Sequence, residues 1–366
     1  MTSQTTLSPF LDDLETRLNA EEERTLLGRW LDFYDGKTKT DIFSANRKNK
    51  YPARVKWPRI LINEAIKGDG FDEMILRELK SVSDALEVGA GDIPCIRSNY
   101  GTGILPSVFG AGIFYLDDDA NTLPTTEPLG GKDKIKAIID HGIPSKKTSL
   151  MQKTFECAER YLEATKSHPK IQKYVHYYHP DFQGPMDVVE LLWGSDLFLD
   201  ICDSPGLVKD LLALVTDTYI SFMKQWNAIM PPFDRDYSVQ WGMLVKGQLV
   251  LRDDSAMNFS PEMYAEFIRP CDQKIFDAFG GGMIHFCGRG SHYIAAMSRM
   301  RGLHGINLSQ PHCNDLSAVF ENTIEKDLRI IGFPYEAAQQ EQKAGRRFNG
   351  KLHCQLSSKA DFPSKA

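Results

Sequence analysis

Apolar side chains recur at helical spacing over much of the chain. The segment 9–35 mixes leucines and aromatic residues with acids and bases at this spacing, and the segment 71–88 places Met74, Leu79 and Leu86 on one face. We therefore expect a helix over each segment. Gly89 directly follows the second segment and predicts its end, because glycine suits the residue after a helix.

The second half of the chain alternates predicted helices with short apolar runs. Ser204-Pro205 and Ser260-Pro261 each begin a predicted helix, since serine caps a helix and proline suits its first position. Predicted strands lie at 93–97, 174–179, 237–245, 283–286, 305–308 and 328–333. This alternation favours an α/β fold that closes as a (β/α)8 TIM barrel over an open doubly wound sheet.

The pattern divides the chain into two parts. Residues 1–60 hold the first predicted helix and a polar, irregular stretch from Asp35 to Pro58, so we expect an N-terminal extension packed on the barrel. Residues 61–366 carry the strand–helix alternation and form one catalytic barrel domain in this interpretation. Loops that follow barrel strands carry the chemistry of such folds.

Composition narrows the class of protein. The 366 residues are 42% hydrophobic and 25% charged, as in ordinary globular domains, and the net charge of −6 argues against a nucleic-acid partner. No apolar run reaches the roughly 18 residues of a membrane helix, and the N-terminus lacks the features of a secretion signal. The seven cysteines show no disulfide spacing. We expect a cytoplasmic enzyme with reduced thiols.

His285 and Cys287 are the first candidates for chemistry. They lie two residues apart at the end of a predicted strand, so their side chains share a face. A thiolate and an imidazole on one face suit zinc, although the same spacing also occurs where both residues are structural. A catalytic zinc has three protein ligands and one open position. Cys313 and Cys354 are the candidates for the third ligand.

Two adjacent carboxylates, Asp253 and Asp254, follow another predicted strand. They suit proton transfer or the orientation of a ligand. The alternative is a polar loop ahead of the helix that Ser260 caps.

Two further turns follow predicted strands. Arg97, Asn99 and Tyr100 lie in a glycine-containing turn that lacks the lysine of a phosphate-binding loop, so we expect it to line the mouth of the barrel. His179 ends the predicted strand 174–179 and Gln183 follows it; one face of this strand is expected to be core and the other to line the pocket. No GxGxxG motif follows a strand, which argues against a nicotinamide cofactor.

Several of these motifs together resemble the uroporphyrinogen decarboxylase superfamily. The segments are Gln183-Gly-Pro-Met-Asp187, Asp203-Ser-Pro-Gly-Leu-Val208, Arg252-Asp-Asp through Ser260-Pro-Glu-Met-Tyr264, and His285-Phe-Cys-Gly288. The resemblance covers roughly residues 80–335 and implies a (β/α)8 barrel. The arginine-rich stretch with which the decarboxylases bind their tetrapyrrole is not found in this chain.

The resemblance is closest to the corrinoid-dependent methyltransferase branch, of the methylcobamide:coenzyme M type. That branch binds zinc through His-x-Cys and a distant cysteine, which implies His285, Cys287 and Cys354 as ligands here. It also implies a methylcorrinoid as co-substrate, supplied on a separate carrier protein. In this interpretation Asp253 orients the reacting groups, and Tyr100 and His179 form pocket walls.

The function expected from the sequence is therefore zinc-dependent methyl transfer between a corrinoid and a small substrate, with a thiol as one candidate. Arg97, Asn99, Gln183 and Asp254 are the candidate substrate-binding residues. One alternative is a decarboxylase of a tetrapyrrole or a small carboxylic acid. Another is a non-catalytic barrel that binds a corrinoid or a different ligand.

Overall fold

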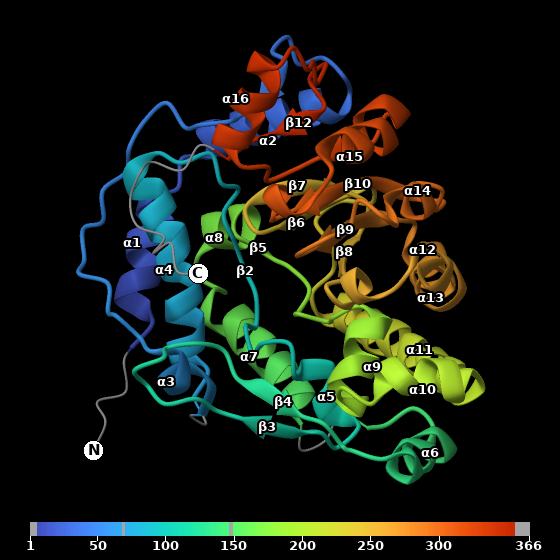
Figure 1. The fold of residues 1–366 in the computed structure, drawn as a ribbon. Helices are drawn as coiled ribbons and strands as arrows, with labels where there is room; N and C mark the ends of the chain where they lie inside the picture. The colour runs from blue at the N-terminus through green and yellow to red at the C-terminus, as the bar shows by residue number, and fades with distance from the viewer. Residues whose placement is uncertain (1–5, 68–69, 146–148, 356–366) are drawn as a thin grey trace.

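The computed structural model describes residues 6–67, 70–145 and 149–355 as a mixed α/β fold. Figure 1 shows helices on the outer side of the strands, with α13, α14 and α15 flanking β8, β9 and β10. The strands are β1 (Ile42–Phe43), β2 (Cys95–Ile96), β3 (Gly112–Phe114), β4 (Thr125–Glu127), β5 (His176–Tyr177), β6 (Tyr237–Gln240), β7 (Met243–Lys246), β8 (Leu249–Arg252), β9 (Gly282–Phe286), β10 (Leu303–Leu308), β11 (Arg329–Ile330) and β12 (Leu352–His353).

The helices connect and cover these strands. Most are α-helices, while a π-helical segment, η2 (Tyr264–Ile268), separates α12 from α13, and a 3-10 turn, η1 (Ser255–Asn258), follows β8. The α-helices are α1 (Ser8–Arg17), α2 (Ala20–Tyr34), α3 (Ile62–Lys67), α4 (Asp72–Val88), α5 (Ile104–Val108), α6 (Lys132–His141), α7 (Leu150–Ala164), α8 (Pro169–Tyr174), α9 (Pro185–Trp193), α10 (Leu197–Asp203), α11 (Pro205–Ile229), α12 (Pro261–Met263), α13 (Arg269–Phe279), α14 (Ile294–Met297), α15 (Leu316–Asn322) and α16 (Tyr335–Lys343).

The main sheet is parallel, as the alternation of strands and helices predicts. Its order is β1-β12-β11-β10-β9-β8, and β2 and β5 form a separate parallel pair. A backbone hydrogen bond of 2.8 Å from Gly184 N–H to the Arg252 carbonyl joins the chain after β5 to β8. The strands do not form one continuous, closed ladder in the described residues, so the closed barrel of the sequence analysis is present only as a barrel-like arrangement.

The N-terminal segment contributes to the sheet itself. The expected extension over residues 1–60 supplies α1 and α2, but it also supplies β1, which pairs in parallel with β12. Trp30 of α2 packs against Phe43 of β1 and against His353 of β12. Helix α2 and the edge of the sheet therefore share one hydrophobic cluster.

The segment 237–245 differs from the single strand predicted for it. The chain reverses at Trp241 and Gly242, both with positive φ (49° and 76°), and β6 and β7 pair as an antiparallel hairpin. Leu244 of this hairpin is buried in one cluster with Val250 and Met283 of the main sheet. The residues on both sides of the turn are apolar, and for this reason the sequence pattern predicts a single strand.

Side-chain alternation along β9 gives the sheet two different faces. Met283 joins the cluster of the hairpin, whereas Ile284 and Phe286 join the larger cluster that includes the surrounding helices. His285 therefore projects on the face of Met283.

The predicted helices largely agree with the structure. The segment 71–88 is α4, and Gly89 follows it in the left-handed conformation (φ 73°). The segment 9–35 divides into α1 and α2, because the Asn19 side chain caps α2 by accepting from the backbone N–H groups of Glu21 and Glu22. Among the described residues, no helix combines the length and the apolar composition that crossing a bilayer requires.

Two buried histidines predict how stability depends on pH. Burial lowers the pKa of His179 and of His353 to about 3, below the ordinary value of 6.5. Below pH 6.5 the two histidines bind protons in the unfolded chain, whereas in the folded chain they stay neutral down to about pH 3. Their contribution to the free energy of unfolding is therefore complete above pH 6.5 and is lost as the pH falls towards 3. Each histidine contributes about 1.4 kcal/mol per pH unit in that window.

Urea denaturation at pH 7.5 and at pH 5.0 measures this effect. We expect His353→Gln to reduce the loss of unfolding free energy between the two pH values by about 2 kcal/mol. The same change at the exposed His312 is the matched control and leaves the loss as in the wild type. An unchanged loss in His353→Gln would contradict the buried, neutral imidazole.

Candidate metal site

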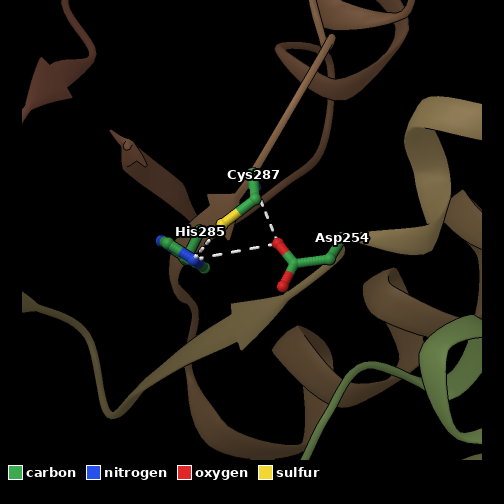
Figure 2. Close-up of side chains that lie close together, drawn as sticks. All are labelled: Asp254, His285 and Cys287. Atoms are coloured by element: carbon green, nitrogen blue, oxygen red, sulfur yellow. Dashed lines mark hydrogen bonds and ion pairs between the residues drawn. The ribbon is translucent and has the colours of Figure 1, made fainter. Parts of the chain in front are cut away.

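His285 and Cys287 meet at the end of β9. His285 is in the strand and Cys287 directly follows it, and the distance from Cys287 Sγ to His285 Nε2 is 3.5 Å. Both side chains thus lie on the same face, in agreement with their spacing of two residues. Figure 2 shows the two side chains converging with that of Asp254.

Asp254 brings a carboxylate to the same point from the loop after β8. Its Oδ1 accepts a hydrogen bond of 2.6 Å from Cys287 N–H and lies 3.8 Å from His285 Nε2. One ligand atom of each of the three residues lies within 4.8 Å of the others (Figure 2). The candidate metal site is therefore Asp254, His285 and Cys287.

Cys354, the third ligand implied by the sequence resemblance, is not part of this group. It follows β12, where its backbone N–H donates to the Phe43 carbonyl, and its side chain is buried in the larger hydrophobic cluster. His353, its neighbour, occupies the opposite face of the strand against Trp30. Strand alternation therefore turns Cys354 away, and Asp254 supplies the third donor atom instead.

Asn307 of β10 orients the imidazole of His285. The Asn307 Oδ1 lies 2.6 Å from His285 Nδ1, and the Asn307 Nδ2 donates to the Ile331 carbonyl, which fixes which end of the amide faces the histidine. Because the amide oxygen only accepts, Nδ1 carries the proton and Nε2 keeps a free lone pair towards Cys287 and Asp254. Sequence reasoning missed Asn307 because no motif marks it.

Asp187 of α9 holds the loop that carries Asp254. Its two carboxylate oxygens accept hydrogen bonds from the backbone N–H groups of Asp254 (3.1 Å) and Ser255 (2.8 Å). The Ser309 hydroxyl, from the loop after β10, lies 3.2 Å from Cys287 Sγ. Each ligand therefore has a neighbour that restricts its position before any metal binds.

Burial sets the protonation of the two β9 ligands. It lowers the pKa of His285 below its ordinary value and raises the pKa of the Cys287 thiol. At neutral pH the imidazole is therefore neutral, and the thiol keeps its proton until a cation displaces it. Metal binding at this site releases a proton.

An arginine network lies beside the site. Arg252 is level with His285 in the pairing of β8 with β9, and its Nε donates to Asp181 Oδ1 at 2.7 Å. Arg97 Nη1 lies 3.0 Å from Asp181 Oδ2. Burial opposes ionisation of Asp181, but the two guanidinium groups outweigh it and lower the pKa of Asp181 to about 2. Arg97 is thus held by Asp181 in this structure.

Asp253 points away from the group that its neighbour Asp254 joins. It is buried against Asp272 of α13, and burial raises the pKa of both carboxyl groups; the charge of Asp272 adds to the rise at Asp253. A proton shared by Asp253 and Asp272 satisfies oxygens that have no other partner among the described residues. The structure does not bring Asp253 to the position of an orienting carboxylate at the candidate metal site.

The other candidates from the sequence contact neighbours that do not belong to that group. Tyr100 is buried in the larger hydrophobic cluster, and both ring nitrogens of His179 are engaged, Nδ1 by the Pro180 carbonyl and Nε2 by Val250 N–H. Asn99 donates to Glu78 and Gln183 donates to Asp181. None of these four side chains is among the three that converge on the candidate metal site.

The donor set and its spacing fit zinc. Sulfur, imidazole nitrogen and carboxylate oxygen are its usual ligands, and bonds of 2.0–2.3 Å in a tetrahedron place neighbouring ligand atoms roughly 3.5 Å apart. The separations of 3.5 Å and 3.8 Å from His285 Nε2 agree with that geometry. Three protein ligands leave a fourth position for a substrate.

Comparison with known proteins gives a likeness in fold. A solved structure described as a methyltransferase from Methanosarcina mazei superposes with a TM-score of 0.60, at 15% sequence identity, over 92% of this chain and 94% of that one. The likeness is to the whole fold. No family model matches the chain, and no curated protein shows detectable sequence similarity to it.

Zinc content distinguishes Asp254 from Cys354 as the third ligand. We expect about one zinc per chain in the wild type, a loss of zinc in Asp254→Ala, and retention in Cys354→Ala, because only Asp254 shares a point with His285 and Cys287. Metal analysis of the purified variants after dialysis measures this. Retention in Asp254→Ala with loss in Cys354→Ala would reverse the assignment.

Removal of the Asn307 amide tests the orientation of His285. Asn307→Ala frees the imidazole, so we expect zinc affinity to fall by about 10- to 100-fold. Competition with a chelator of known affinity measures the change. Asn322→Ala on α15 is the control, and equal affinities in the two variants would mean that Asn307 does not position His285.

Proposed function

We propose that this chain is a zinc-dependent methyltransferase that moves a methyl group between a corrinoid, carried by a partner protein, and a small substrate. The observation that carries the proposal is the convergence of Asp254, His285 and Cys287 at the carboxyl ends of β8 and β9. Loops at this end of parallel strands carry the active sites of (β/α)8 barrels, and we propose that the described strands form a scaffold of that type.

The fold supports the activity at a coarse level. One solved structure with a similar fold is described as a methyltransferase. The sequence motifs, among them His285-Phe-Cys-Gly288, agree with a corrinoid-linked branch of that activity. The three candidate ligands support a methyl transfer that depends on a metal ion.

The residues of this chain have separate tasks in the proposal. Zinc, when bound, would act as a Lewis acid on the small substrate; for a substrate that carries a thiol, it would keep the sulfur deprotonated at neutral pH. Asn307 directs the Nε2 lone pair of His285 to the site, and Asp187 holds the loop of Asp254. Cys287 gives up its proton on metal binding and adds a negative charge beside Asp254.

Access to the site also fits a reaction with an external partner. The His285 side chain is 15% exposed, whereas that of Asp254 is 45% exposed. Trp241 packs against His285 on one side and under the guanidinium of Arg252 on the other. The imidazole is therefore sheltered, while the side of Asp254 is open to a substrate.

Methyl transfer from methylcobalamin to a panel of small thiols and amines tests the proposed activity, followed by the change in cobalt absorbance. We expect zinc-loaded wild type to accelerate the transfer, and Cys287→Ala to lower the rate by at least about 100-fold, or roughly 2.7 kcal/mol of transition-state stabilisation. Cys202→Ala, at an exposed cysteine of α10, retains the wild-type rate.

Two outcomes count against the proposal. If zinc-free and zinc-loaded protein have equal rates, the metal has no part in the reaction. If zinc binds but neither direction of transfer is accelerated with any acceptor or methylated donor, the chain is a binding protein rather than a methyltransferase.

A further inference from the structure

An open cavity of about 330 Å³ adjoins the candidate metal site. Its walls come from α9, from the loop after β8, and from the segments around α5 and β4. Asp254 belongs both to this wall and to the group with His285 and Cys287. A molecule in the cavity therefore lies next to the candidate ligands.

The charged side chains in the cavity wall are all acidic. They are Asp187, Glu190 and Asp254, and no lysine, arginine or histidine is among the described residues that line the cavity. Asp187 is engaged by backbone N–H groups, and Asp254 faces His285. Glu190 makes no side-chain hydrogen bond or ion pair with any residue in the described part of the chain, so its charge is available to a ligand.

The rest of the wall suits a small alkylated group. Leu191, Phe198 and Pro128 supply apolar surface, one of them aromatic. Thr126 also lines the cavity and is only 8% exposed. Its hydroxyl has no hydrogen-bond partner among the described residues. An acidic group beside an aromatic ring and apolar side chains is a favourable surface for an ammonium ion with alkyl substituents.

The neighbouring arginines do not reverse this preference. Asp181 binds both Arg97 and Arg252, and neither arginine is among the described residues that line the cavity. Neither arginine therefore offers its charge to an anionic substrate in the cavity, where the Glu190 carboxylate would repel such a substrate.

We propose that this cavity binds the small substrate of the site and that this substrate carries a positive charge, as an amine or a quaternary ammonium group. The proposal rests on the proposed function for its link to methyl transfer, but binding in the cavity is separate from that chemistry. Glu190 supplies the charge that recognises the substrate, and Phe198 contacts its alkyl groups.

Binding of choline and of its uncharged carbon analogue, 3,3-dimethylbutan-1-ol, to the full-length protein tests the charge preference. The two probes have the same shape, so isothermal titration compares charge alone. We expect choline to bind about tenfold more tightly, and Glu190→Gln to remove most of this difference, because one close carboxylate is worth roughly a factor of ten at a partly exposed site. Glu321→Gln, the same change on α15 and outside the cavity, retains the difference.

The outcomes separate this inference from the proposed function. Equal binding of the two probes, or a difference that survives in Glu190→Gln, overturns the inference even if zinc binding and methyl transfer are present. A choline preference that depends on Glu190, in a protein without zinc or transfer activity, supports the cavity and counts against the proposed function. A thermal unfolding midpoint of Glu190→Gln equal to that of the wild type shows that the variant is folded.

Discussion

Parallel pairing of β9 with β8 on one side and with β10 on the other is the constraint on which the candidate site depends. It sets His285 level with Arg252 and with Asn307, so that three side chains of different chemistry lie side by side on one face. A shift of one residue in this register would turn His285 towards the helices, since neighbouring strand positions face opposite sides. Asp254 and Cys287, in the loops directly after β8 and β9, therefore start close to His285.

Polar neighbours hold the candidate ligands in position. Asn307 fixes the tautomer of His285, and Asp187 binds the backbone that carries Asp254. Both contacts cross between elements far apart in the chain. This arrangement lowers the cost of bringing the ligands together, because their side chains lose little further freedom when a cation binds.

Charge is distributed unevenly around His285. Arg97 and Arg252 share Asp181, which offsets part of their positive charge inside the fold. The open cavity beside Asp254 is lined by acidic side chains, with no basic side chain among the described residues of its wall. The apolar wall of that cavity, with Phe198, adds a surface for alkyl groups. In our proposal, this wall gives the site its preference for a small substrate with a positive charge.

The sequence by itself determined the features that depend on neighbouring residues. Strand geometry alone places His285 and Cys287 on one face, and the glycine after α4 ends that helix where the pattern predicts. The same local reasoning wrongly predicts one strand over 237–245. Apolar residues lie on both sides of Trp241, and the chain reverses there within two residues of positive φ, so the hydrophobic pattern does not reveal the turn.

Only the tertiary structure decided the third member of the group. Asp254 and Cys354 are both near strand ends, and nothing in their local sequence distinguishes the one that reaches His285. The choice follows from which face β12 turns towards Trp30 and from the position of the loop that Asp187 holds after β8. Both depend on strand order and register, which long-range contacts set and which the spacing of residues along the chain does not encode.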